Sequence, residues 1–249
     1  MRKRIPLKLE RLTNMKGNIA LVGSGEWLPV MLDLERELLN NQNPVYVQLS
    51  TAAGQESSAR LEHWKNLAQT QAKSLSVESR WLPVFDNDSA NNPEFVEKIK
   101  GAGLIYLSGG DPTYLAESLR DSLVWKTIVS EWENGASLAG CSAGAMALTT
   151  WVPKMRIKIG KNNEDVKGLG LLPNIRVIPH FDRMLGWIPD IITRNLLNTP
   201  PGVTLVGIDE KTALIGGTNS WTVKGEQSVW VLTHDGREEF KPGQTLITN

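Results

Sequence analysis

The fold of this chain is decided by one stretch, Leu138-Ala139-Gly140-Cys141-Ser142-Ala143-Gly144-Ala145-Met146-Ala147-Leu148. It reads as an apolar strand, an abrupt turn of small residues and an apolar helix, which is the pattern of a nucleophile elbow. In such a Gly-x-Ser-x-Gly turn the serine hydroxyl is exposed at the corner, and a backbone N–H at the helix start can hold an oxyanion. The register makes Ser142 the nucleophile, with Cys141 directly before it. An ordinary Gly/Ala-rich turn is the alternative, and the pentapeptide alone does not separate the two.

Apolar runs that end in glycine loops predict the rest of the fold. The strand candidates are residues 18–25, 45–49, 81–85, 103–110, 137–140, 175–180, 204–210 and 212–215. The helix candidates are residues 30–39, 57–74, 94–100, 114–132 and 188–197, and Asp86-Asn87-Asp88 is interpreted as a solvated turn. This alternation predicts an α/β fold, a mostly parallel sheet with helices on both faces and ligands at the carboxyl ends of its strands. The glycine loops at 23–26 and 109–110 should therefore meet the elbow at one edge.

The tail and one basic segment are predicted to lie outside this parallel core. Residues 221–225 and 229–232, with the turn at 234–236, predict a C-terminal antiparallel hairpin or meander. Residues 154–158, followed by Lys161 and Lys167, are interpreted as a solvated strand or loop, or alternatively as a rim that attracts anions.

The composition indicates a globular protein whose net charge does not favour a highly charged binding partner. In 249 residues, 27 Lys+Arg balance 27 Asp+Glu, so neither nucleic acid nor an anionic membrane is expected as a partner. No run of about 18 apolar residues predicts a membrane span. The single cysteine allows no internal disulfide, and no Cys/His cluster suggests a metal site. These features fit a cytoplasmic location.

The first residues are interpreted separately from the domain. Residues 1–16 are basic but contain no apolar core of about 7–15 residues as in a secretory signal, so we expect a disordered arm or sequence upstream of a true start at Met15. A mitochondrial presequence fits less well because the segment is short and has little serine. Residues 17–249 are predicted to form a single α/β domain, since no low-complexity linker divides them.

A serine nucleophile needs a base, and His180 is the best-placed histidine. His63 falls within a predicted helix and His234 within a tail turn, whereas His180 ends a predicted strand and can reach the sheet edge that carries the elbow.

The acid that orients this base stays open on the residues alone. Asp182, Asp209 and Glu210 all lie near predicted strand ends. Strand alternation sends Asp209 and Glu210 to opposite sides, so only one of these two can face His180.

Four motifs then follow one another along the chain. They are Ser108-Gly109-Gly110-Asp111, Gly140-Cys141-Ser142-Ala143-Gly144-Ala145, Gly168-Leu169-Gly170-Leu171 with Pro179-His180-Phe181, and Gly207-Ile208-Asp209-Glu210-Lys211-Thr212-Ala213. Over about residues 18–232 the chain resembles peptidase family S51, especially its cyanophycinase-like and dipeptidase E-like members. The resemblance implies a class I glutamine amidotransferase-like, flavodoxin-like fold.

The resemblance also implies a mechanism. It assigns a serine peptidase triad to Ser142, His180 and Glu210, and an oxyanion hole to the backbone N–H groups of Gly110 and Ala143. A peptide or isopeptide carbonyl would acylate the serine, His180 would protonate the leaving amine, and water would hydrolyse the acyl-enzyme. No metal or organic cofactor is implied, and a homodimer is compatible with the family.

Substrate contacts are expected at Asp111, Pro112, Arg183 and Trp187, with Trp27 as a further pocket wall. Cyanophycinases carry Gln where this chain has Pro112, and several arginines where Arg183 is followed by Met184-Leu185-Gly186-Trp187. We therefore expect hydrolysis of a small peptide or isopeptide substrate without specificity for cyanophycin.

Two other functions are weighed against this one. A glutamine amidotransferase-like enzyme would use Cys141, although the motif places this residue one position before the nucleophile. A non-catalytic protein that binds a small molecule or peptide would keep the pocket without the chemistry.

Overall fold

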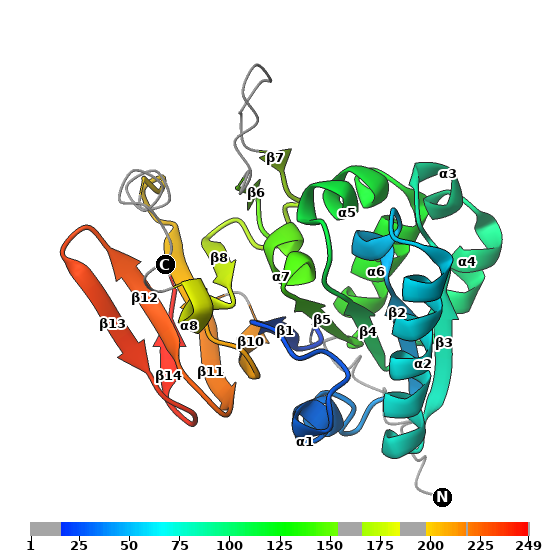
Figure 1. Ribbon diagram of the computed structural model, residues 1–249, viewed down its shortest axis with the longest axis horizontal. Helices are drawn as coiled ribbons and strands as arrows, with labels where there is room; N and C mark the ends of the chain where they lie inside the picture. Colours follow the sequence, from blue (N-terminus) through cyan, green and yellow to red (C-terminus); the bar gives the residue numbers. More distant parts are fainter. Residues whose placement is uncertain (1–15, 154–165, 185–197, 218, 249) are drawn as a thin grey trace, which may run out of the picture.

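The computed structural model describes residues 16–153, 166–184, 198–217 and 219–248, and a mixed sheet lies at its centre (Figure 1). Its strands are β1 (Ile19–Val22), β2 (Val45–Leu49), β3 (Glu78–Leu82), β4 (Leu104–Leu107), β5 (Ser137–Cys141), β10 (Thr212–Gly217), β11 (Ser220–Gly225) and β14 (Thr245–Ile247). They are arranged in the order β14-β11-β10-β1-β5-β4-β2-β3. Within this order, the strands β1, β5, β4, β2 and β3 are parallel to one another. The strands β10, β11 and β14 add antiparallel pairs on the other side of β1. The predicted mostly parallel sheet is confirmed.

Helices cover both faces of this sheet. They are α1 (Leu32–Leu38), α2 (Ser58–Leu75), α3 (Asn87–Ala90), α4 (Pro93–Ile99), α5 (Pro112–Leu119), α6 (Leu123–Glu133), α7 (Ala143–Leu148) and α8 (Phe181–Met184), with 3₁₀ turns η1 (Pro29–Met31) and η2 (Thr51–Ala53). Because side chains alternate along a strand, Leu21 of β1 belongs to an apolar core that includes residues of α5, α6 and α7, whereas its neighbour Ala20 belongs to a core that includes residues of α1 and α2. The two apolar faces therefore form two separate cores.

A second sheet brings the remaining motifs to the elbow. It contains β8 (Ile175–Pro179), β9 (Thr204–Ile208), β12 (Val229–Thr233) and β13 (Gly236–Phe240), in the order β13-β12-β9-β8. Because β8 and β9 are parallel and pair from Ile175 opposite Thr204 to Pro179 opposite Ile208, the segments that carry His180 and Glu210 leave this sheet at the same edge. A short pair, β6 (Trp151–Val152) and β7 (Val166–Lys167), lies beyond α7.

The antiparallel tail differs from the expected arrangement. Residues 221–225 and 229–232 were expected to belong to one hairpin or meander, but β11 pairs with β10 and β14, and β12 pairs with β9 and β13. The hairpins are β10–β11 and β12–β13, in separate sheets. The antiparallel strands and the hairpin turn at 234–236 are confirmed, but residues 221–225 and 229–232 do not pair with each other, because alternation along one strand does not identify its partner.

Three local predictions are corrected as well. The helix expected over 114–132 is two helices, since Asp121 has a φ of 61° and the Ser122 hydroxyl caps α6. The strand expected over 81–85 is β3, which begins earlier, at Glu78. Because β3 lies at the sheet edge, its first half is polar, and the apolar residues of the sequence mark only its end. The turn expected at Asp86-Asn87-Asp88 is the start of α3, because the Asp86 carboxylate accepts the Ser89 N–H at 2.8 Å.

Several predictions fall outside the described residues: those for residues 1–15, for the basic segment 154–158 with Lys161, and for the helix over 188–197. Of the helices that the structure describes, none combines the length and apolarity needed to cross a membrane.

Candidate active site

The turn at Ser142 is an elbow in structure as well as in sequence. Ser142 joins β5 to α7 with φ 50° and ψ −106°, a backbone conformation that is strained for a residue with a side chain. Its N–H donates to the Val22 carbonyl at 2.9 Å, which ties the elbow to the end of β1. A Cβ atom on Gly140 would lie 2.6 Å from the Gly144 backbone, so a glycine is needed for this close approach of strand and helix.

Three side chains from three segments form one chain of hydrogen bonds at this corner. Ser142 Oγ lies 2.9 Å from His180 Nε2, and His180 Nδ1 lies 2.9 Å from Glu210 Oε1. An ionised carboxylate only accepts hydrogen bonds, so the Glu210 contact places the imidazole proton on Nδ1 and leaves Nε2 to accept from the serine. The arrangement can remove the hydroxyl proton as the oxygen attacks an electrophile.

The structure also separates the three candidate acids. Asp209 is buried on the other side of the chain, where it accepts hydrogen bonds from Trp230 Nε1 at 3.1 Å and the Ser228 N–H at 3.2 Å. Burial raises the pKa of Asp209 above its usual value. Asp182 accepts the Glu210 backbone N–H at 2.9 Å. Of the three, Glu210 contacts His180, and Asp182 holds the backbone that carries Glu210.

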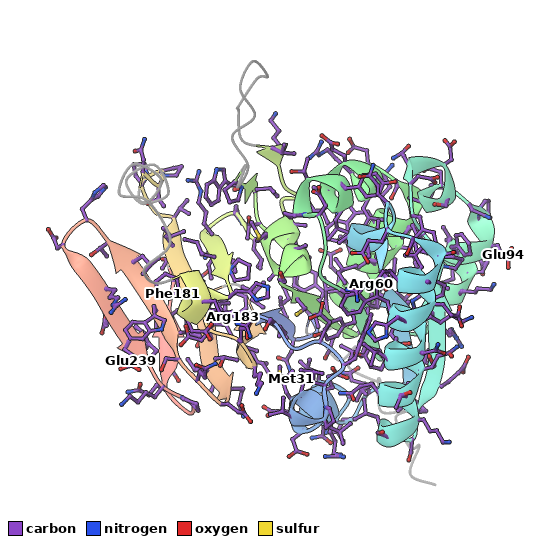
Figure 2. The ribbon with its side chains drawn as sticks, viewed as in Figure 1. Met31, Arg60, Glu94, Phe181, Arg183 and Glu239 are labelled. Atoms are coloured by element: carbon purple, nitrogen blue, oxygen red, sulfur yellow. The ribbon has the colours of Figure 1, made fainter. Side chains whose placement is uncertain are left out.

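Two residues that the sequence did not link to the triad hold the Glu210 segment. Arg183 Nε lies 3.0 Å from Glu210 Oε2, while the arginine side chain is 74% exposed. In the view of Figure 2, Arg183 lies on α8 between the C-terminal strands and α7. Gln227 Nε2 donates to the Glu210 carbonyl at 3.0 Å and to Asp182 at 3.4 Å. Gln227 lies between β11 and β12, where no sequence motif marked it.

The glycine loop after β4 lies against the nucleophile. A Cβ atom on Gly109 would be 3.4 Å from Ser142 Cβ, and one on Gly110 would meet the Ala52 carbonyl oxygen at 2.4 Å. Gly110 also has a φ of +138°, which side chains rarely allow. Ala143 is the first residue of α7, and N–H groups in a first helical turn have no acceptor within the helix. Of the two expected oxyanion donors, Ala143 therefore directly follows the serine, and Gly110 directly follows the glycine that lies against it.

Two of the expected substrate contacts have structural roles. Asp111 Oδ1 accepts the N–H groups of Thr113 and Tyr114 at 2.9 and 3.0 Å, which caps α5, and Pro112 is the first residue of that helix. This geometry explains an Asp-Pro pair without a substrate, although it does not prevent contact with one.

The two expected tryptophan walls have different outcomes. Trp27 is 3% exposed, and its Nε1 donates to the Tyr46 hydroxyl at 3.2 Å within the core beneath α1 and α2. The expectation of a pocket wall at Trp27 is wrong, because its ring packs in this core against Trp64 and Tyr106. Trp187 lies outside the described residues.

Cys141 is poorly suited to be a nucleophile. It is fully buried, its thiol donates to Glu26 Oε2 at 3.0 Å, and burial raises its pKa well above the usual value. Because a thiolate is the reactive form of cysteine, these surroundings disfavour amidotransferase chemistry. The part of the chain that the structure describes also contains no group of three or more His, Cys, Asp or Glu residues that could hold a metal ion.

The comparisons with known proteins follow the same motifs. A sequence profile of peptidase family S51 matches residues 19–221. The chain belongs to peptidase family S51. This match covers both glycine loops, the elbow and the segments that carry His180 and Glu210.

Similar proteins include peptidases and cyanophycinases. The cyanophycinases of Synechococcus elongatus and Thermosynechococcus vestitus are each 29% identical over 164 residues, which is 61% of this chain. The chain spans about half the length of these curated relatives, since 48% of each is covered. The crystal structure of a peptidase from an acI-B1 actinobacterium is 44% identical, with a TM-score of 0.86 over 94% of this chain and 98% of that one.

A more distant structure supports the fold alone. A putative peptidase E protein from Listeria monocytogenes EGD-e is 18% identical, with a TM-score of 0.62 over 86% of this chain and all of that one. Together with the S51 profile, these likenesses agree with the α/β fold expected from the sequence.

Proposed function

We propose that this S51 member is a serine peptidase that hydrolyses small peptides or isopeptides. The observation that carries the proposal is the unbroken hydrogen-bonded chain from Ser142 Oγ through His180 to Glu210, with both contacts at 2.9 Å. Such a chain activates a hydroxyl that is otherwise a weak nucleophile.

The proposed reaction has two halves. In the first, His180 Nε2 takes the proton of Ser142 as Oγ attacks the substrate carbonyl carbon, and the oxyanion is held by the N–H groups of Gly110 and Ala143. His180 then gives the proton to the leaving amine as the C–N bond breaks. In the second half a water molecule loses a proton to His180 and attacks the ester carbonyl, and that proton returns to Ser142 Oγ as the acid leaves.

We further propose that the substrate is not cyanophycin. Pro112 lacks both an amide side chain and a backbone N–H, so it cannot replace the hydrogen bonds of the glutamine found in cyanophycinases. Arg183 is engaged with Glu210 through Nε. An arginine that is engaged in this way, or replaced by another residue, does not make a charged contact with the substrate. Each such contact that is lost costs about 1.5–3 kcal/mol of binding free energy, which is roughly tenfold to more than a hundredfold in specificity.

The proposal is tested with a substrate panel. We expect kcat/KM for β-Asp-Arg to lie well below that of the best α-dipeptide or apolar-capped dipeptide, and Ser142→Ala to abolish turnover of every hydrolysed substrate. If β-Asp-Arg is the best substrate by a wide margin, the specificity proposal is wrong. If peptides bind at concentrations below about 1 mM without hydrolysis, the chain is a binding protein.

Two further expectations belong to the proposal. The single cysteine is buried and free, which fits a reducing cytoplasm as the proposed location. A homodimer stays a prediction, which sedimentation would test.

A further inference from the structure

The loop that follows β1 contributes a carboxylate between the two motifs of the site. Glu26 is half-buried, and each of its oxygens has a partner. Oε1 accepts the Gly109 backbone N–H at 2.8 Å, and Oε2 accepts the Cys141 thiol at 3.0 Å. Gly109 directly precedes the oxyanion donor Gly110, and Cys141 directly precedes the nucleophile Ser142. One side chain therefore joins the two segments whose spacing an oxyanion hole depends on.

We propose that Glu26 is a positioning residue, which fixes the glycine loop after β4 at the distance from Ser142 that oxyanion binding requires. The inference rests on the proposed serine hydrolase function and adds a residue to it. Glu26 touches neither Ser142 Oγ nor the proposed donors, so it acts through Gly109 and Cys141.

The backbone of the glycine loop shows why such an anchor is needed. The N–H of Ser108 donates to Leu49 at 3.0 Å, that of Gly109 to Glu26 at 2.8 Å, and that of Asp111 to Ala52 at 2.8 Å. Within the described residues, the Gly110 N–H is the member of this run without a protein acceptor. Without Glu26, the N–H of Gly109 would lose its acceptor. The pair Gly109 and Gly110 would then offer little resistance to backbone rotation.

The shape of the loop is adapted to the carboxylate. A Cβ atom on Gly109 would lie 2.6 Å from Glu26 Oε1, so a side chain at position 109 would displace the anchor. The residue after Glu26 is itself fixed, because Trp27 is buried and donates to Tyr46 at 3.2 Å. The anchor is therefore attached to the core on one side and to the glycine loop on the other.

The contribution of Glu26 is geometric, since a negative charge near a developing oxyanion opposes its formation. A glutamine can reproduce both contacts. Its oxygen can accept the Gly109 N–H, and its amide can donate to the Cys141 sulfur. Glu26→Gln should therefore keep the loop in place, whereas Glu26→Ala should release it.

The experiment compares these two variants with Glu117→Ala, which removes an exposed carboxylate from α5. The best dipeptide substrate of the wild-type protein gives kcat and KM, and NMR hydrogen exchange gives the protection of the Gly109 amide. Loss of a whole oxyanion donor lowers kcat by about 10²–10³-fold. For a displaced donor we expect Glu26→Ala to lower kcat about 10–100-fold with KM changed less than about threefold, and to lose Gly109 protection. Glu26→Gln should restore protection and stay within about fivefold of the wild-type kcat.

The outcomes separate this inference from the proposed function. If the wild-type protein is active and Glu26→Ala keeps its kcat within twofold, the positioning role is wrong while the function stands. If Glu26→Gln loses as much kcat as Glu26→Ala, the charge matters and the geometric account is overturned. If the wild-type protein hydrolyses nothing, the proposed function fails; the exchange measurement still tests the anchor, and equal Gly109 protection in Glu26→Ala and the wild-type protein overturns it.

Discussion

Glu210→Gln tests the proposed triad most selectively, because it removes one charge and almost no volume. The Glu210 carboxylate lies 2.9 Å from His180 Nδ1 and is largely buried, with 17% of the side chain exposed. Two unit charges about 4 Å apart interact by about 4 kcal/mol at an effective dielectric constant near 20, which corresponds to about 10³-fold in rate. In the variant, Arg183 would also face the imidazolium without the intervening carboxylate. We therefore expect kcat to fall about 10³- to 10⁴-fold, with little change in KM.

The two neighbouring acids supply matched controls. In Asp182→Asn an oxygen can still accept the Glu210 N–H, so we expect less than about tenfold loss of kcat. In Asp209→Asn the change lies beside Trp230, away from His180, and should alter thermal stability more than kcat. Steady-state kinetics on the best dipeptide, with a thermal melt for each variant, measure both effects. A Glu210→Gln enzyme within tenfold of wild-type kcat, or a larger loss in Asp182→Asn, would refute the assignment of Glu210.

Three other predictions concern pH and packing. The measured kcat/KM should fall as the pH drops from about 8 to 5, since a histidine base must be neutral to accept a proton; a flat profile contradicts a histidine base. Burial raises the pKa of Glu35 from 4.5 to about 8, so the folded state keeps a proton that the unfolded state releases. The Glu35 contribution to the free energy of urea unfolding should therefore be fully present below about pH 4.5 and fall by about 1.4 kcal/mol per pH unit up to about pH 8, and Glu35→Gln should remove this part of the pH dependence. Gly140→Ala should cost about 1–3 kcal/mol in the same assay, because its Cβ would lie 2.6 Å from the Gly144 backbone; unchanged stability contradicts that contact.

The sequence was most informative where glycine and strand ends coincide. Gly140 and Gly144 identified the elbow because few residue types allow a strand and a helix to approach so closely. His180 could be selected because it ends a strand, although that strand pairs with β9 in a second sheet and does not belong to the sheet that carries the elbow. The strand alternation that separated Asp209 from Glu210 is also seen in their different partners.

The remaining features depend on contacts between segments that are distant in the sequence. Glu26 meets Gly109 across 83 positions, and Cys141 across 115. Neither contact produces a pattern in the local sequence, although the Gly-Ser-Gly-Glu loop after the first strand was predicted to lie at the sheet edge that carries the elbow. Trp27 was expected in the pocket because it follows a glycine loop, but the same local pattern is equally compatible with a side chain that is buried in the core. The break between α5 and α6 was missed because apolar spacing continues across Asp121.

The central claim is that Ser142 is a nucleophile activated by His180. Its most direct measurement is the intact mass and peptide map of the protein after reaction with a fluorophosphonate. The account predicts one adduct in the wild-type protein, on the peptide that contains Ser142, formed in parallel with loss of hydrolytic activity. It predicts no adduct in Ser142→Ala and greatly slowed adduct formation in His180→Ala. A hydrolytically active wild-type protein that forms no adduct, or a Ser142→Ala protein that is labelled at the wild-type rate, would contradict the claim.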